Sequence, residues 1–248
     1  MANDLQWLES QLAQQGVLVS AYIVANGISH DNIQTYIEQG QLQRLSIGLY
    51  GKEQQDVSWP YIVNALQHQQ LIPVRLSGIT SLKVQGMISE PITSGEKIQL
   101  VSNQFEKLPK WAHEQSVSVV NKVSRIFSKT PENQLTNVEL NGLTLVASSV
   151  ELSILEYLEQ VTDEARFGAA LKLIQSIESI NIDNMLSLLI HSASDKANRL
   201  FLHFACKTQQ KWAKAFSEVP VSDEVVTVIR DGIVDTRHNI TIPAFYPA

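Results

Sequence analysis

Polar side chains that can recognise nucleic acid are concentrated in one short segment near the N-terminus. Asn32, Gln34 and Thr35 alternate with apolar residues at helical spacing, so a helix through this segment would present them to a ligand. Asparagine and glutamine amides pair well with the acceptor and donor that adenine presents in the major groove. Ser29 and His30 would lie at the helix N-terminus, where backbone N–H groups favour a phosphate. These residue types predict recognition of base edges in double-stranded DNA.

The surrounding residues have the order of a helix-turn-helix. Ser20 is predicted to cap a helix over residues 21–26, and Ser29 a second helix over residues 30–39. A glycine follows each helix and can close it in the left-handed conformation. Two capped helices three residues apart are typical of a DNA-reading motif.

A β-wing is predicted directly after the second helix. Residues 42–45 and 49–50 alternate like two short strands around a turn at 46–48. Arg44 and Lys52 flank this wing and are the expected phosphate contacts.

The charge of this segment opposes tight DNA binding. Residues 1–60 carry two basic and six acidic residues, a net charge of −4 in a chain of −6. Asp31 and Glu38, on the second helix, would face the DNA backbone and oppose binding. The densest basic set lies in the middle of the chain, and it either supplies phosphate contacts, touches a partner or is a solvated face: Lys107, Lys110, Lys122, Arg125 and Lys129.

The rest of the chain predicts an α+β fold. Strands are expected at 72–76 and 97–101, and Asn141-Gly142 is the preferred dipeptide of a type I′ hairpin turn. From residue 149 the apolar spacing becomes helical, with four stripes and a short fifth helix, before a final hairpin that pairs 225–229 with 233–234 and a last strand at 240–242.

We therefore expect an N-terminal winged helix-turn-helix followed by a mixed α+β region with a mainly helical distal half. The predicted domains are 1–58 and 59–248. The second either folds as one domain or divides into a mixed part at 59–148 and a helical part at 149–248.

Signatures of catalysis or of a cofactor are not found in the sequence. It has no glycine-rich phosphate loop and no G-x-S-x-G elbow. The six histidines are scattered, so neither a metal site nor a cofactor is expected. The only cysteine, Cys206, lies in an apolar helical stripe and is predicted to be core. Arg199, Trp111 and Trp212 are likewise assigned structural roles.

The expected location is the cytoplasm. A single cysteine excludes an intrachain disulfide and fits a reducing compartment. No apolar run approaches the roughly 18 residues that span a membrane, and the N-terminus lacks the basic and apolar segments of a signal peptide.

An ordered series of short motifs resembles the AbiEi-type antitoxins of bacterial type IV toxin–antitoxin, or abortive infection, systems. The N-terminal matches are Gly16-Val17-Leu18, Gly27-Ile28-Ser29, Tyr36, Gly40, Leu42 and Gly48-Leu49-Tyr50. The later matches are Ala65-Leu66-Gln67, Gly78 to Gly86, Leu108-Pro109-x-Trp111, RLFLHFA at 199–205, Trp212 and NITIP at 239–243. The series covers nearly the whole chain in the right order.

This resemblance implies a winged helix-turn-helix joined to an antitoxin domain. It also implies repression of the protein's own operon through inverted repeats in the promoter, as a homodimer or by cooperative binding. The functional partner would be a nucleotidyltransferase-like toxin, with direct binding left open. Two alternatives remain: an interaction module or orphan regulator that has lost strong operator binding, and an enzyme, for which no site is recognisable.

Overall fold

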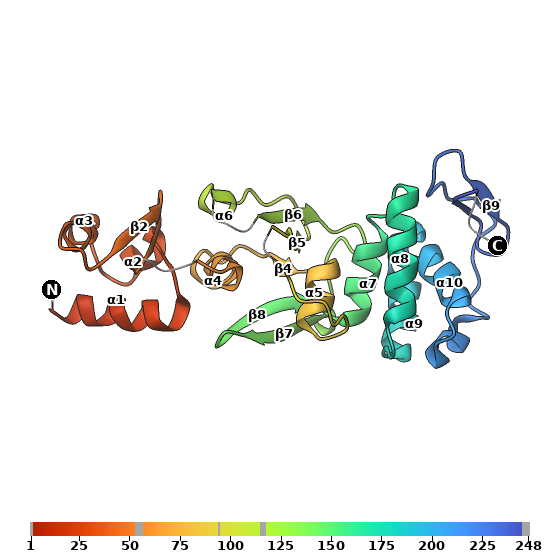
Figure 1. Ribbon diagram of the computed structural model, residues 1–248, viewed down its shortest axis with the longest axis horizontal. Coiled ribbons are helices and arrows are strands. Elements are labelled where there is room, and N and C mark those ends of the chain that lie inside the picture. The colour runs from red at the N-terminus through yellow and green to blue at the C-terminus, as the bar shows by residue number, and fades with distance from the viewer. Residues whose placement is uncertain (1, 53–56, 94, 115–117, 245–248) are drawn as a thin grey trace. The chain divides into compact units, whose positions relative to one another are not determined.

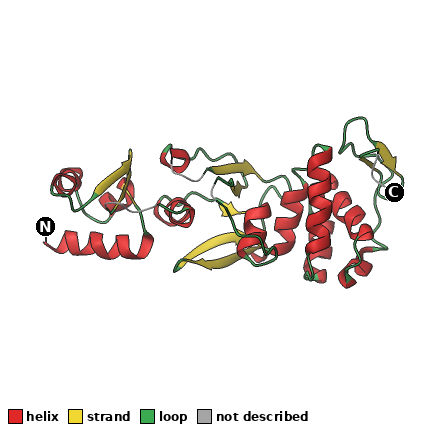
Figure 2. Cartoon of the chain, in the orientation of Figure 1, coloured by secondary structure: helices red, strands yellow, loops and turns green. Residues whose placement is uncertain are grey.

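The chain forms two compact units in a computed structural model that describes residues 2–52, 57–93, 95–114 and 118–244 (Figure 1). Unit 1 comprises Met1–Leu76, Ile92–Val123 and Thr136–Ala147, and unit 2 comprises Ser77–Pro91, Ser124–Leu135 and Ser148–Ala248. The predicted α+β class is confirmed: helices occur in both units, whereas most strands belong to unit 1 (Figure 2). The division at residues 58 and 148 stays a prediction.

The N-terminal part of unit 1 is a winged helix-turn-helix. Its elements are α1 (Ala2–Gln15), β1 (Leu18–Val19), α2 (Ser20–Ala25), α3 (His30–Glu38), β2 (Gln43–Ser46) and β3 (Leu49–Gly51). The three strands form one sheet in the order β1-β3-β2. The predicted helix-turn-helix and wing are therefore confirmed, and β1 is an additional strand that the sequence pattern did not indicate.

The start of α2 differs from the prediction. Ser20 lies inside the helix, the N-cap is Val19, and no side chain caps this end. Val19 pairs with Leu49 in the sheet, and the Ser20 N–H donates to the carbonyl of Gly48 at 2.9 Å. The prediction that Ser20 caps α2 is wrong, because the strand leads directly into the helix and the turn before β3 already satisfies the N–H group.

The start of α3 agrees with the prediction. The Ser29 hydroxyl accepts a hydrogen bond from the backbone N–H of Asn32 at 3.2 Å. Ile33 and Tyr36 turn inward and belong to the same core cluster as Leu8 of α1. Burial, with the nearby Asp4 carboxylate, raises the pKa of Tyr36 above its ordinary value. The inward face of α3 is thus fixed by the core, which determines the face left for a ligand.

The rest of unit 1 is built on a five-stranded sheet in the order β6-β5-β4-β8-β7. The strands are β4 (Arg75–Leu76), β5 (Ile98–Ser102), β6 (Val119–Val123), β7 (Leu135–Leu140) and β8 (Leu143–Ser148), accompanied by α4 (Trp59–Asn64), the π-helical turn η1 (Ala65–Gln69) and α6 (Trp111–Glu114). Asn141 and Gly142 both have positive φ, 53° and 76°, which confirms the predicted I′-like hairpin turn. Strand β4 is shorter than predicted.

Two buried glutamines of η1 replace missing ladder hydrogen bonds in unit 1. Gln67 donates to the carbonyls of Val74 and Val146 at 3.0 and 2.9 Å, and accepts from the Val146 N–H at 2.9 Å. Gln69 accepts from the Val19 N–H at 2.7 Å. These amides therefore join η1 to β1 and β8.

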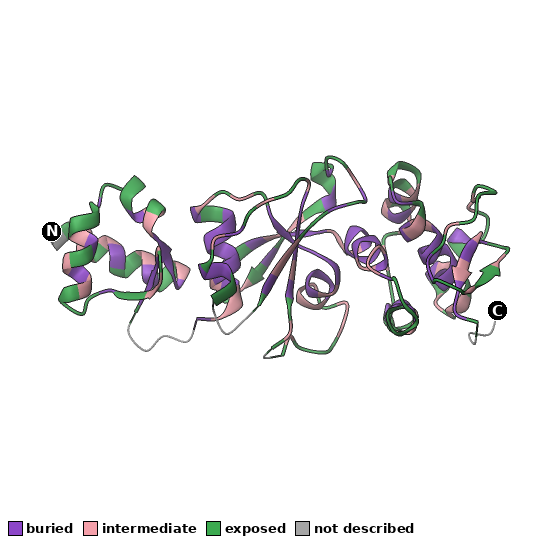
Figure 3. Cartoon of the chain, turned by 90° about the horizontal axis from the view of Figure 1, so that it is seen from above, coloured by how far each residue is buried: buried purple, intermediate pink, exposed green. Residues whose placement is uncertain are grey.

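Unit 2 is mainly helical. Its elements are α5 (Gly78–Val84), η2 (Glu132–Gln134), α7 (Val150–Leu158), α8 (Glu164–Ser176), α9 (Ile182–His191), α10 (Asp195–Lys207), η3 (Lys211–Phe216), β9 (Ile233–Asp235) and β10 (Ile240–Ile242). The four long predicted helices are confirmed, and side-chain oxygens accept from backbone N–H groups at their N-caps, Ser149, Asp163, Asn181 and Ser194. Buried residues, purple in Figure 3, include the aromatic set Phe167, Phe201, Phe204 and Trp212.

The final hairpin is formed by different strands than predicted. β9 pairs antiparallel with β10, whereas Val226 makes only an isolated parallel bridge with Ile240. The N–H groups of Val228 and Ile229 donate to the hydroxyl of Thr241, each at 2.9 Å. The predicted strand over 225–229 is therefore wrong, because a side chain takes the place of the ladder.

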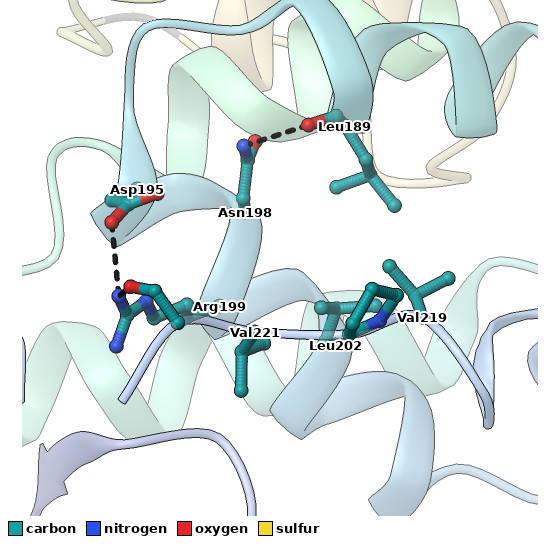
Figure 4. A pocket seen from close by; sticks show the side chains of 9 residues that line it. Leu189, Asp195, Asn198, Arg199, Leu202, Val219 and Val221 are labelled. Atoms are coloured by element: carbon teal, nitrogen blue, oxygen red, sulfur yellow. Dashed lines mark hydrogen bonds and ion pairs between the residues drawn. The ribbon is translucent and has the colours of Figure 1, made fainter. Parts of the chain in front are cut away.

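Arg199 anchors the C-terminal segment to α10. Its guanidinium donates to the carbonyls of Glu224 and Asn239, the latter at 3.0 Å. It also pairs with the Asp195 carboxylate at 2.9 Å and donates to the Ser222 hydroxyl at 2.6 Å. Figure 4 shows the pair of Asp195 and Arg199 at the edge of a pocket of about 100 Å³. The predicted structural role of Arg199 is confirmed.

In the described part of the chain, no helix combines the length and apolar character needed to cross a membrane.

Ser29→Ala should loosen α3 specifically. Removal of the cap costs about 1 kcal/mol, so the α3 amides should exchange hydrogen about fivefold faster in native-state exchange. Ser20→Ala is the matched control, because this hydroxyl does not cap α2. Equal acceleration in both variants would contradict the assignment of Ser29 as the cap.

Arg199→Met should destabilise unit 2 by about 3 kcal/mol, because the part-buried carbonyls of Glu224 and Asn239 would lose the donor that the buried guanidinium supplies. Urea denaturation followed by circular dichroism measures this change. Asp195→Asn is the control: the Asp195 side chain is 67% exposed, so its replacement should cost less than about 1 kcal/mol. Similar stabilities for Arg199→Met and the unmodified chain would show that the guanidinium does not hold the C-terminal segment.

Candidate nucleic-acid interface

The outward face of α3 carries the side chains expected to read DNA. Ser29, His30 and Gln34 are exposed, while Asn32 and Thr35 are half-buried. All five lie on or next to the same helix, so the structure brings the predicted set together on one element. Its buried face packs on α1, which leaves the opposite face available to a groove.

Two of these side chains already have partners within α3. Gln34 Nε2 donates to Glu38 Oε1 at 3.0 Å, and the Thr35 hydroxyl donates to the Asp31 carbonyl at 2.9 Å. An exposed i,i+4 pair is worth only about 0.2–0.5 kcal/mol, whereas a good bidentate base contact gives about 1–3 kcal/mol. A base contact would be the stronger of the two, so the pair with Glu38 would not prevent Gln34 from reading a base.

The wing presents the two expected phosphate contacts. Arg44 on β2 and Lys52 just beyond β3 are both exposed. Gly48, with φ of 81°, turns the chain between the strands and leaves Ile47 at the tip with 86% of its surface exposed. The wing is therefore short, and its two cations are outnumbered by the acidic side chains of the same module.

The basic set of the middle region is divided by the fold. Lys107, Lys110 and Lys122 belong to unit 1, whereas Arg125 and Lys129 belong to unit 2. All are exposed, and the Arg125 guanidinium lies 3.9 Å from the Glu159 carboxylate. The set is therefore two groups, of which the first shares a unit with the winged helix.

The aromatic and thiol assignments have different outcomes. Trp111 and Trp212 are buried, and the Trp212 ring N–H donates to the Ile177 carbonyl at 3.0 Å, which confirms their structural role. Cys206 is exposed, so its assignment to the core is wrong. It follows Ala205 at the end of α10, where the apolar stripe has already turned away toward the core.

Tertiary packing gathers two of the histidines that look scattered in the sequence. His203 on α10 and His238 beyond β9 both place Nδ1 next to Asp235 Oδ2, at 2.8 and 2.7 Å. Among the described residues, these three side chains form a group that could hold a metal ion. The local signal was the D-x-x-H spacing of Asp235 and His238; nothing local indicated His203, which lies 32 residues before Asp235.

Burial and hydrogen bonding set the protonation of this group. Burial outweighs the Asp235 hydrogen bond and lowers the pKa of His203. Burial opposes ionisation of Asp235, but the hydrogen bonds from His238 and His203 outweigh it and hold the pKa of Asp235 below its ordinary value. A neutral imidazole thus lies beside an ionised carboxylate at neutral pH.

The comparisons with known proteins agree with these features. Residues 1–90 match the family model described as the N-terminal domain of the transcriptional regulator and AbiEi antitoxin. Residues 95–243 match the model described as transcriptional regulator, AbiEi antitoxin, type IV toxin–antitoxin system. Among curated proteins, none matches the sequence.

A solved structure shares the fold. The crystal structure of the RV2827C protein from Mycobacterium tuberculosis aligns with a TM-score of 0.62 over 97% of this chain and 91% of that chain, at 13% sequence identity. The two family matches together cover both units, and the chain therefore belongs to the AbiEi family of antitoxins and transcriptional regulators of type IV toxin–antitoxin systems.

Proposed function

We propose that the protein is a DNA-binding autorepressor that acts in the cytoplasm as the antitoxin of a type IV system. The observation that carries this proposal is the winged helix-turn-helix, whose capped helix α3 turns polar side chains outward. Membership of a family of transcriptional regulators supports the same function. The toxin partner would resemble nucleotidyltransferases, and its neutralisation does not require a stable complex with this chain.

In the proposed complex, α3 enters the major groove. Asn32, Gln34 and Thr35 contact base edges, with adenine the preferred base for the two amides. Ser29 and His30 approach a phosphate at the helix N-terminus. The base contacts specify the operator, and the phosphate contacts set the register.

The phosphate contacts of one module are few. Arg44 and Lys52 would neutralise two phosphates, which gives a salt slope of about −2 per protomer. Two protomers on an inverted repeat would raise this to about −4. A homodimer or cooperative pair is therefore part of the proposal, with further phosphate or partner contacts assigned to Lys107, Lys110, Lys122, Arg125 and Lys129.

One observation favours a second function. The acidic charge of residues 1–60, with exposed Asp31 and Glu38 on α3, suits a module that contacts basic proteins. In that case the winged helix would be an interaction module without operator binding. The two functions differ in whether the protein binds the DNA upstream of its own gene.

Arg44→Ala combined with Lys52→Ala should weaken binding to upstream DNA. The slope of log K against log salt concentration should become less negative by about 1 for each cation removed from each protomer, because fewer counterions are released. Gel shifts of the full chain at several salt concentrations measure the slope. Lys211→Ala with Lys214→Ala removes two cations of η3 as a charge-matched control and should leave the slope unchanged. Absence of a shift even at low salt would reject the repressor and leave the interaction module.

Gln34→Ala combined with Thr35→Ala should remove sequence discrimination. The affinity for the operator should drop by about 1–3 kcal/mol for each base-reading side chain that is truncated, while binding to unrelated DNA should stay constant. Competition gel shifts with specific and unrelated duplexes measure both affinities. Gln6→Ala with Gln14→Ala, two exposed positions of α1, is the control. Unchanged operator affinity in Gln34→Ala, Thr35→Ala would exclude α3 as the reading helix.

A further inference from the structure

Three side chains of metal-ligating type converge in unit 2. They are His203 on α10, Asp235 at the end of β9 and His238 in the turn before β10. Their ligand atoms all lie within 4.8 Å of one another. The two imidazole rings are perpendicular, with centroids 5.6 Å apart, so both Nδ1 atoms reach the same carboxylate oxygen from different directions.

The group is enclosed by the fold. The side chains of His203 and His238 are 5% and 8% exposed, and that of Asp235 is 18% exposed. The carboxylate therefore remains in contact with solvent, while the imidazoles are held by packing. His203 also lies against Phe167 and Phe204, with ring centroids 5.8 and 5.6 Å away. Such packing orients the donor atoms before any ion arrives.

We propose that His203, Asp235 and His238 form a binding site for a divalent transition-metal ion, with Zn²⁺ as the best fit. Two imidazole nitrogens and one carboxylate oxygen, with a fourth position open to water, are a common zinc ligand set. Imidazole also favours this class of ion over Mg²⁺ or Ca²⁺, which prefer oxygen ligands.

The distances leave room for the ion after a small adjustment. A tetrahedral zinc with bonds of about 2.0–2.1 Å holds its ligand atoms about 3.3 Å apart. The observed separations of 2.8 and 2.7 Å would therefore lengthen by about half an ångström. Such a shift is within the reach of side-chain rotation, so the backbone of α10 and of the hairpin can stay in place.

The proton balance of binding is simple. In the hydrogen-bonded arrangement each imidazole donates from Nδ1 to Asp235. To bind the ion, each imidazole holds its proton on Nε2 in place of Nδ1, so that the Nδ1 lone pair can coordinate. The net charge of the protein is unchanged by this tautomer shift, and the carboxylate already carries the negative charge that a ligand needs.

Cys206 lies where it can orient the imidazole of His238. Its Sγ lies 3.6 Å from Nε2 of His238, the ring nitrogen that does not face Asp235. A proton on Nε2 can point at this sulfur, which would hold the ring in its coordinating tautomer. Cys206 is thus a positioning residue and not a ligand.

The site would act as a cross-link between α10 and the β9–β10 hairpin. His203 belongs to the helix, and the other two ligands belong to the hairpin. Because the unfolded chain does not hold these ligands together, the ion would bind the folded state preferentially and raise its thermal stability. This role is independent of DNA binding, so the gel shifts above do not test it.

The test uses the full chain without a histidine tag, stripped of metal by a chelator. Calorimetric titration with Zn²⁺ should give one bound ion per chain. Thermal unfolding with Zn²⁺ present should give a higher Tm than the metal-free chain has. The variants His203→Gln and His238→Gln should lose this ion and the rise in Tm, whereas His191→Gln, an exposed histidine of α9, should keep both. Cys206→Ser should retain the site with about tenfold lower affinity.

Co²⁺ provides a spectroscopic check of the ligand set. The visible bands of a four-coordinate ion are expected, without the near-ultraviolet band of a thiolate ligand. The Tm of each metal-free variant shows whether that variant is folded. Cys206 is exposed, so Cys206→Ser is expected to fold and tests the site even if a histidine variant unfolds.

Three results would overturn the proposal. They are the lack of stoichiometric Zn²⁺ binding by the unmodified chain, undiminished binding by folded His203→Gln or His238→Gln, and a thiolate band that disappears in Cys206→Ser.

Discussion

Backbone groups that are buried outside the regular ladders must still be hydrogen-bonded, and this requirement connects distant segments in both units. In unit 1, Gln67 and Gln69 supply the missing bonds to β1 and β8. In unit 2, Arg199 does the same for the carbonyls of two segments that follow α10. A few long polar side chains thus complete the main-chain pairing of both units. An apolar replacement at one of these positions would remove the hydrogen-bond partner of a backbone group that is at least partly shielded from water, and the cost rises with the burial of that group.

Helix α10 combines the structural and the proposed ligand chemistry of unit 2. Arg199 and His203 are four residues apart and therefore lie on the same side of the helix. The first binds the Asn239 carbonyl, and the second binds Asp235, so both contact the β9–β10 hairpin. The guanidinium places the hairpin, and the hairpin places two of the three proposed ligands. The geometry of the proposed metal site therefore depends on the buried guanidinium of Arg199, which is not one of its ligands.

In the N-terminal module, the shape of the fold favours DNA binding, whereas its acidic charge opposes it. The cap and the buried face of α3 build the shape of a winged helix-turn-helix from local chemistry. The exposed carboxylates of Asp31 and Glu38 on the same helix repel phosphates and weaken sequence-independent attraction. In the proposed repressor, base contacts and the pairing of protomers would then carry more of the affinity than charge does. Such a module would bind few sites outside its operator, because little of its affinity comes from the backbone.

The sequence by itself determined the features that depend on neighbouring residues: the cap at Ser29, the hairpin turn at Asn141 and Gly142, the four helices after residue 149 and the polar face of α3. These follow from side chains acting on the backbone within a few residues, so their signals are local. Only the tertiary structure decided that Ser20 lies inside its helix, because the carbonyl that accepts from the Ser20 N–H belongs to Gly48, in the turn of the wing. The same holds for the convergence of His203 with the final hairpin. Packing brings such groups together across long stretches of chain, and no spacing along the sequence encodes that proximity.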